Sequence, residues 1–375
     1  TVRFICKDPA PIDLIASSLY GAYIYSPRAA DLGEKWFNQG NELGTGPYRV
    51  VERVRGDYLK MAQFDKYWGG WKPQQFREVH MHIEPDNDKQ LEMILSGNAD
   101  AVNQIPLGAV HSLGSELNIS VAIGTSWVNT QFLINTKKYP TDNLLFRRAL
   151  TYAWDYDAVV EHIYSGWASV PRGIIPSTLW GHDKDLPKQQ FDLEKAKALL
   201  LASGIPKEDW KISLTHVASS EGYRRAARLY QYTLEQIGVK LEIKTGPWAE
   251  TWSAAKNIET ASNLQSMTWW PTYPTPSDYL KGLFYTEEKT LFNLSHYSNP
   301  TFDRLVDEGI RMEGVDRKQS VKYYQQAQQI LYDDAVAIFY ADNADRRIFR
   351  SDIEGMVLNP AYNPIFIYQL SRTAP

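Results

Sequence analysis

The sequence predicts an α/β protein of two lobes. Its 375 residues correspond to two or three domains at about 150 residues each. Strand and helix signals alternate along most of the chain, which is typical of sheets covered by helices. The pattern changes at Asn143, where a longer α/β stretch begins. Because no internal repeat or low-complexity linker separates the two parts, we expect short crossings between two lobes.

The pattern in the first part of the chain predicts three extended segments at residues 48–53, 58–64 and 76–84. A helix at 88–96 and a short strand at 100–102 are expected to follow. Gly56-Asp57 separates the first two segments and indicates a hairpin. The third alternates apolar and polar residues, as a strand does. Gly97 follows the helical pattern and is expected to end the helix. The order indicates a βαβ-like rhythm within one sheet.

The second part predicts helices at 144–154, 156–164, 192–203, 221–237 and 316–332, and strands at 211–216, 240–243 and 336–340. The helix at 221–237 is the clearest, because one apolar stripe runs along it before Gly238. Asp316 and Gln319 occupy capping-box positions. From Ile353 onward, an extended segment with prolines is expected.

Composition excludes several classes of protein. A hydrophobic fraction of 43% and a charged fraction of 22% suit a globular chain rather than a disordered one. With a net charge of -4 and no block of Lys or Arg, we expect no nucleic-acid partner. No run of about 18 apolar residues predicts a membrane-spanning helix. The single cysteine, Cys6, allows no internal disulfide.

Two motifs resemble ligand-binding sites, but ordinary structural roles explain both of them better. Gly44–Gly46 is followed by Pro47 and a strand, whereas a phosphate-binding loop needs free N–H groups and a helix. His80 and His82 share a strand face, and Glu84 could join them at a metal ion. We prefer the interpretation that both histidines are solvated on the polar face of the strand, and we therefore expect no metal site.

No sequence motif supports an enzymatic function. No serine lies in a Gly-x-Ser-x-Gly context. The adjacent carboxylates Asp333-Asp334 and Glu287-Glu288 indicate solvated charge. We therefore expect neither catalytic residues nor a cofactor.

The segment 266–280 carries the strongest functional signal. A strand leads into three prolines set among aromatic residues. Prolines restrict the loop and lower the entropy needed to present Trp269, Trp270 and Tyr273 to a ligand. The alternative is that these rings pack beneath the loop and form part of the core instead of contacting a ligand. We predict that at least one of the tryptophans lines a ligand cleft.

Several segments in register resemble the peptide/nickel-type extracellular solute-binding proteins of ABC importers, the family of oligopeptide- and dipeptide-binding proteins. The similar segments are Leu43–Tyr48, Tyr67-Trp68, Phe146–Asp155, Asp192–Gly204, Pro276–Leu280, and Tyr297–Pro300 with Asp303. Together they cover the chain from about Gly44 to Tyr340. The resemblance implies a two-lobe, type II periplasmic-binding-protein fold with a hinge between the lobes.

The resemblance also implies a domain arrangement. The family's chain begins well before Thr1, so residues 1–30 are expected to be the remnant of an inserted subdomain. Lobe one would be residues 31–135 plus 346–375, and lobe two residues 136–345.

The ligand-binding residues expected from this alignment are Trp269, Trp270, Thr272, Tyr273 and Asp278, to which we add Trp127 and Asn129. Thr272 stands where oligopeptide binders carry an aspartate that pairs with the ligand's amino group. Ser266 stands where some members carry a basic residue. An uncharged site rich in aromatic rings favours a neutral solute, such as an oligosaccharide, over a free peptide.

The resemblance therefore implies a non-enzymatic, monomeric binder that delivers a peptide or another small organic solute to an ABC permease in the membrane. It implies a periplasmic or extracellular location, with a lipoprotein anchor as a further option for the full-length form. The alternative from another class is a secreted hydrolase that holds polysaccharide in an aromatic cleft. That enzyme would need a pair of cleft carboxylates, which no motif supplies.

Overall fold

The computed structural model describes residues 3–7, 9–18, 23–361 and 365–373. The chain forms two compact units. The larger unit comprises Thr1–Ser18 and Thr125–Ala344, and the smaller unit comprises Leu19–Gly124 and Asp345–Pro375. The division changes first between residues 18 and 19, and the chain then passes between the units inside two strands, β5 (Ile119–Ile134) and β10 (Ala337–Arg350). The lobe boundaries expected from the sequence stay a prediction.

Five strands in the order β10-β5-β9-β7-β8 form the centre of the larger unit, and they belong to a seven-stranded sheet. Besides β5 and β10 it contains β7 (Lys211–Val217), β8 (Lys240–Gly246) and β9 (Leu264–Trp269), and β6 (Ala168–Ser169) pairs with β10. Strand β7 runs parallel to both β8 and β9, whereas β5 is antiparallel to β9. The carboxyl ends of β7, β8 and β9 therefore meet at one edge of the sheet.

One face of this sheet is covered by α5 (Leu144–Tyr152), α7 (Leu193–Ala202) and α8 (Glu221–Gln236). The buried rings of Trp154, Tyr230 and Tyr340 meet Phe132 of β5 there. The predicted helix at 221–237 is confirmed as α8. The helix expected at 156–164 winds instead as one α-helical turn, α6 (Tyr156–Ala158), and a π-helical segment, η3 (Val159–Ile163). A short 3₁₀ helix, η4 (Lys207–Asp209), precedes β7.

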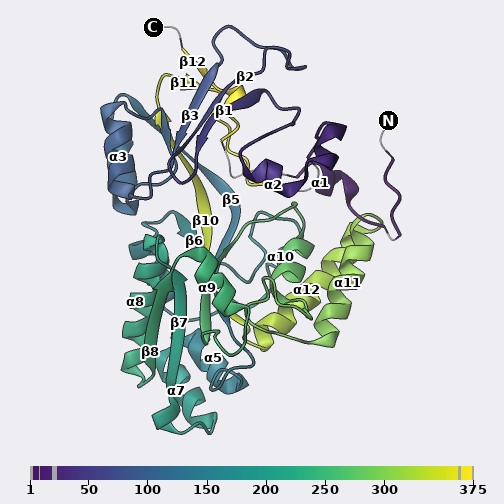
Figure 1. The fold of residues 1–375 in the computed structure, drawn as a ribbon. Coiled ribbons are helices and arrows are strands. Elements are labelled where there is room, and N and C mark those ends of the chain that lie inside the picture. The colour runs from purple at the N-terminus through teal and green to yellow at the C-terminus, as the bar shows by residue number, and fades with distance from the viewer. Residues whose placement is uncertain (1–2, 8, 19–22, 362–364, 374–375) are drawn as a thin grey trace. The chain divides into compact units, whose positions relative to one another are not determined.

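The opposite face carries α10 (Pro276–Phe284), α11 (Pro300–Glu313) and α12 (Arg317–Asp333), as Figure 1 shows. The predicted cap of α12 is confirmed, because Asp316 Oδ1 accepts a hydrogen bond of 3.0 Å from the Gln319 N–H. Helix α9 (Trp248–Ala255) follows β8, and α1 (Ile12–Ala16) also belongs to this unit. Helices α9, α10 and α11 were not expected from the sequence.

The smaller unit contains a three-stranded antiparallel sheet of β1 (Tyr48–Val54), β2 (Tyr58–Gln63) and β3 (Glu78–His82). Its other elements are η1 (Pro27–Asp31), α2 (Gly33–Asn38), α3 (Asn87–Ser96), β4 (Ala101–Val102), η2 (Leu107–Ala109), α4 (Val110–Leu113), β11 (Ile353–Glu354), η5 (Ile367–Gln369) and β12 (Ser371–Arg372). Across the described residues of both units, no helix is long and apolar enough to cross a bilayer.

The predicted hairpin is confirmed as β1 and β2, and α3 ends at Gly97 with a positive φ of 81°. The βαβ rhythm expected for this part is wrong. Strand β3 pairs with β2, whereas β4 pairs with Ile348 and Phe349 of β10, so the two strands lie in different sheets. Strands β1, β2 and β3 each pair antiparallel with a neighbour in sequence, and the helix α3 does not join parallel strands.

Candidate functional site

The residues expected to bind ligand gather at the edge of the larger unit's sheet where β7, β8 and β9 end. In open α/β sheets, ligands bind outside the carboxyl ends of the parallel strands. Trp269 is the last residue of β9, and its partner across the antiparallel pair is Asn129 of β5. Trp127 precedes Asn129 by two residues, and its carbonyl oxygen accepts a hydrogen bond from Tyr279 of α10. The structure therefore brings together segments that are far apart in sequence.

Asp278 holds the loop between β9 and α10 in shape. Its Oδ2 atom accepts hydrogen bonds from the Trp269 indole Nε1 and the Thr272 backbone N–H, each 3.0 Å long. Burial raises the pKa of this carboxyl from 3.8 to about 6, and the hydrogen bonds partly oppose that shift. One donor, Trp269, ends β9, and the other, Thr272, lies in the loop that follows it. The carboxyl group thus fixes the orientation of Trp269 and Thr272.

The indole of Trp269 lies inside the protein, and its residue is 9% exposed. It packs against Gly282 so closely that a Cβ atom there would come within 2.7 Å of Trp269 Cζ2. Its ring also meets Phe292 edge to face, with centroids 5.3 Å apart. By contrast, Trp270 is 44% exposed. Tyr273 and Thr272 are partly buried, and burial raises the pKa of the Tyr273 hydroxyl. The ligand contacts expected of these residues stay predictions.

Asn129 belongs to a buried polar group on the neighbouring strands. Its Nδ2 atom donates to Asp342 Oδ1 at 2.7 Å and to the Gly173 carbonyl at 3.3 Å. The other carboxylate oxygen of Asp342 accepts a bond of 3.4 Å from the Ser177 N–H. Burial raises the pKa of Asp342 to about 6. Sequence reasoning missed Asp342, because only the pairing of β10 with its neighbours places it beside Asn129.

The segment 173–182 joins this polar group to the loop after β9. Trp127 Nε1 donates to Thr178 Oγ1 at 3.1 Å, and Trp180 Nε1 donates to the Pro274 carbonyl at 3.0 Å. Gly181 has a φ of 82°, and a Cβ atom there would come within 2.5 Å of Pro276. The aromatic and proline-rich loop therefore rests on a second loop, and both are held by side-chain hydrogen bonds.

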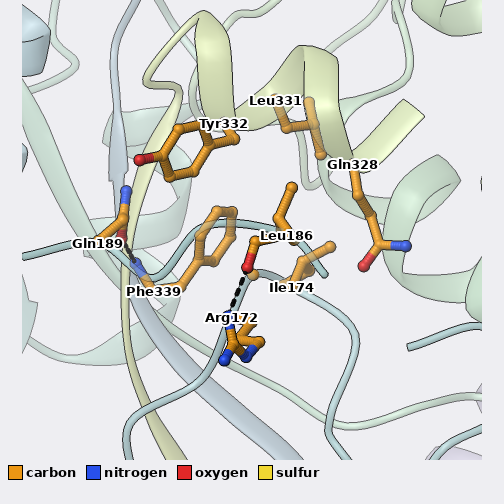
Figure 2. Close-up of a pocket in the computed structure, with 9 residues that line it drawn as sticks. Arg172, Ile174, Leu186, Gln189, Gln328, Leu331, Tyr332 and Phe339 are labelled. Atoms are coloured by element: carbon orange, nitrogen blue, oxygen red, sulfur yellow. Dashed lines mark hydrogen bonds between the residues drawn. The ribbon is translucent and has the colours of Figure 1, made fainter. Parts of the chain in front are cut away.

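A small cavity lies behind the start of this segment, between α12 and β10 (Figure 2). Its volume of about 10 Å³ suits one water molecule rather than a solute. Arg172 donates to the Leu186 carbonyl at 2.8 Å, and the Phe339 N–H donates to Gln189 Oε1 at 3.1 Å, both drawn in Figure 2. We therefore attribute this cavity to packing.

Sequence reasoning also missed a group of aromatic rings beside Trp269. Trp248 and Trp252 of α9 stack with centroids 6.0 Å apart and an interplanar angle of 10°. Trp252 stacks on Phe292 at 5.6 Å, and Phe292 contacts Trp269. The available signal was the spacing of two tryptophans four residues apart, directly after a strand of the α/β lobe.

The described residues contain no group of three or more His, Cys, Asp or Glu side chains that could hold a metal ion. His80 and His82 lie on exposed positions of β3. The residues expected to bind ligand thus comprise one exposed ring, Trp270, one largely buried ring, Trp269, and a carboxyl, Asp278, that is hydrogen-bonded within the protein.

Residues 1–290 match the model of the bacterial extracellular solute-binding proteins, family 5. The chain is 27% identical over 370 residues to a dipeptide-binding protein of Escherichia coli, an alignment covering 96% of this chain and 68% of that protein. It is 26% identical to heme-binding protein A of Haemophilus influenzae over 90% of this chain and 62% of the relative.

The fold matches a solved structure of the periplasmic binding protein DppA from Helicobacter pylori in complex with the peptide STSA. The TM-score is 0.85 at 21% identity, over 98% of this chain and 71% of that one. The predicted two-lobe, type II α/β fold is thereby confirmed. The match of the family model over most of the sequence also confirms the resemblance seen in the motifs. The chain belongs to the bacterial extracellular solute-binding proteins of family 5.

Proposed function

We propose that the chain is the solute-capturing part of an ABC importer, located in the periplasm or outside the cell. It holds a peptide-sized organic solute and passes it to a membrane permease. The observation that carries this proposal is the convergence of Trp127, Asn129 and the loop after β9 at the carboxyl edge of the sheet. Relatives named for dipeptide and heme binding support solute capture as the shared role.

The solute we propose needs no carboxylate partner for a free amino group. Thr272 supplies no charge, and the nearest loop carboxyl, Asp278, already accepts bonds from Trp269 and Thr272. A buried ammonium group without a carboxylate is unfavourable, because burial penalises an unpaired charge. Peptides with a blocked amino end and neutral oligosaccharides therefore suit the site better than free peptides.

The hydrolase alternative receives no support from the site. Glycoside hydrolysis needs one carboxylic acid and one carboxylate on opposite sides of the scissile bond. Asp278 is bound to its own loop, and Asp342 is bound to Asn129 and Ser177. Asp278 and Asp342 therefore do not form a pair of acids placed on opposite sides of a scissile bond.

Titration calorimetry with matched free and N-acetylated dipeptides, together with a panel of neutral disaccharides, tests the proposal. We expect saturable binding with one site per chain, an affinity that acetylation does not lower, and no product after hours of incubation. Tight binding of free peptides that acetylation abolishes would overturn the proposed neutral anchor while leaving solute capture intact. Turnover of a disaccharide would overturn the binding role itself.

A further inference from the structure

The smaller unit carries a motif for N-linked glycosylation directly before β5. The sequence contains two Asn-x-Ser/Thr triplets without proline, which begin at Asn118 and at Asn293. Such a triplet is the acceptor for a glycan on the asparagine amide nitrogen of an exported protein. Glu116 lies two residues before the first asparagine, whereas Leu291 occupies that position before the second. The two triplets therefore differ in the charge beside the acceptor.

The first triplet begins on an exposed turn. Asn118 and Glu116 are exposed, and Leu117 between them is 93% exposed. The backbone of the turn is held in place, because the Ser351 N–H donates to the Asn118 carbonyl at 3.0 Å. Within the described part of the chain, no hydrogen bond uses the side-chain amide of Asn118. That amide nitrogen is therefore available to an enzyme.

The second triplet is buried and serves as an internal comparison. Asn293 is 2% exposed, and Ser295 is fully buried. Asn293 Nδ2 donates to the carbonyls of Tyr285 and Tyr297, at 2.9 and 2.8 Å, so both of its amide hydrogens are used. Its Oδ1 atom accepts a hydrogen bond of 2.7 Å from Ser295 Oγ. Of the two triplets, the folded chain therefore presents the first to an enzyme.

An acceptor asparagine must also leave the protein surface far enough to enter an active site. Ile119, the middle residue of the first triplet, is 8% exposed and anchors it to the core. Ile119 and Ser120 are, however, the first two residues of β5. Residues at the end of a strand open locally at a lower cost in free energy than residues at its centre. Local opening of these two residues exposes the whole triplet.

We propose that Asn118 is an N-glycosylation site and that the transferase recognises Glu116 as the charged group beside it. The inference uses the proposed location in the periplasm or outside the cell. The co-substrate is an oligosaccharide linked through pyrophosphate to a lipid. Asn118 Nδ2 forms a bond to C1 of the first sugar while the bond between C1 and the pyrophosphate oxygen breaks. The lipid pyrophosphate leaves with that electron pair, and the proton lost from Nδ2 passes to the solvent.

A chance match to the motif is the alternative. The triplet is short, and the buried copy at Asn293 illustrates that the residues also occur together for structural reasons. A chance match predicts a folded chain that the transferase does not modify. Modification of the folded chain therefore separates the two interpretations.

The test incubates the purified, folded chain with a lipid-pyrophosphate-linked oligosaccharide and a bacterial oligosaccharyltransferase that is active on its standard acceptor peptide. Mass spectrometry of the intact chain and of its proteolytic peptides counts and locates the glycans. The variants are Asn118→Gln, Glu116→Gln and Glu116→Asp, all at exposed positions of the turn. A synthetic peptide of residues 113–122 reports recognition of the motif without the fold.

We expect one glycan per chain, on Asn118, and none on Asn293. Asn118→Gln should abolish the modification. Glu116→Gln should slow it by about tenfold, the loss expected for one charge-assisted contact, and Glu116→Asp should keep most of the rate.

Three results would overturn the proposal or part of it. A folded chain that stays unmodified while the peptide is glycosylated overturns Asn118 as a site in this fold. A chain and a peptide that both stay unmodified overturn recognition of the motif. Equal rates for Glu116→Gln and the unaltered chain overturn the role of Glu116. Solute capture is tested separately by calorimetry, so none of these results bears on the proposed function.

Discussion

Gly282→Ala tests how the loop after β9 is held. The new Cβ would lie 2.7 Å from Trp269 Cζ2 and 3.2 Å from its Cη2 atom. The indole cannot move away freely, because its Nε1 donates to Asp278 at 3.0 Å. The substitution therefore overfills a site that is clamped on its far side.

The expected loss of stability follows from three contributions. Overpacking a core destabilises by about 1–3 kcal/mol. Alanine in a helix interior is favoured over glycine by about 1 kcal/mol, which offsets part of that loss. If the indole shifts, weakening its bond to ionised Asp278 adds up to about 1.5–3 kcal/mol. We expect a net loss of about 2 kcal/mol in the free energy of unfolding.

Urea unfolding followed by tryptophan fluorescence and by far-UV circular dichroism measures this loss. Gly222→Ala in α8 is the matched control, because its Cβ would meet Tyr164 Oη at an ordinary 3.6 Å. That control should be as stable as the unaltered chain or slightly more so. Equal unfolding free energies for Gly282→Ala and Gly222→Ala would refute the clamp on Trp269.

Three further predictions concern the larger unit. Gly309→Ala should destabilise more than Gly282→Ala, because its Cβ would come within 2.2 Å of the fully buried Tyr324 ring; an unfolding midpoint at or above that of Gly282→Ala would contradict this. Asp192→Ala should lower stability by about 1 kcal/mol by removing the cap on the Lys195 N–H, and an Asp192→Asn variant that keeps most of the stability serves as the control. Burial raises the folded pKa of Asp342 from 3.8 to about 6, so the stability this group contributes is complete below about pH 4 and is lost as the pH rises through about 6. Relative to the unaltered chain, Asp342→Asn should therefore gain up to about 3 kcal/mol between pH 4 and pH 7, and a pH-independent difference would count against this account.

Much of the fold could be predicted from local pattern, and the missed elements have physical reasons. Strand β5 was overlooked because residues 129–134 are buried on both faces, which removes the alternation that marks a half-buried strand. Helices α10 and α11 begin with Pro276 and Pro300, and proline at a helix start resembles proline in a loop. Asn299 caps α11 and was the signal available there.

The segment that forms the candidate site could be predicted from the sequence, but the orientation of its side chains could not. The segment 266–280 was found from its prolines and rings. Which tryptophan turns inward depends on Gly282, a neighbour on the next helix that makes room for Trp269. The Trp248–Trp252 stack and the Asn129–Asp342 bond arise from helix placement and strand pairing, which composition and spacing do not reveal.

Hydrogen–deuterium exchange tests the central claim most directly, namely that solute is captured at the carboxyl edge of the larger unit's sheet. The probe is the tightest binder among the acetylated dipeptides and disaccharides, at saturating concentration. We predict slower exchange in residues 170–182, 246–256 and 266–280, with little change in α7 on the far side of the sheet. Protection confined to other segments, or no protection at saturation, would contradict the site proposed for this chain.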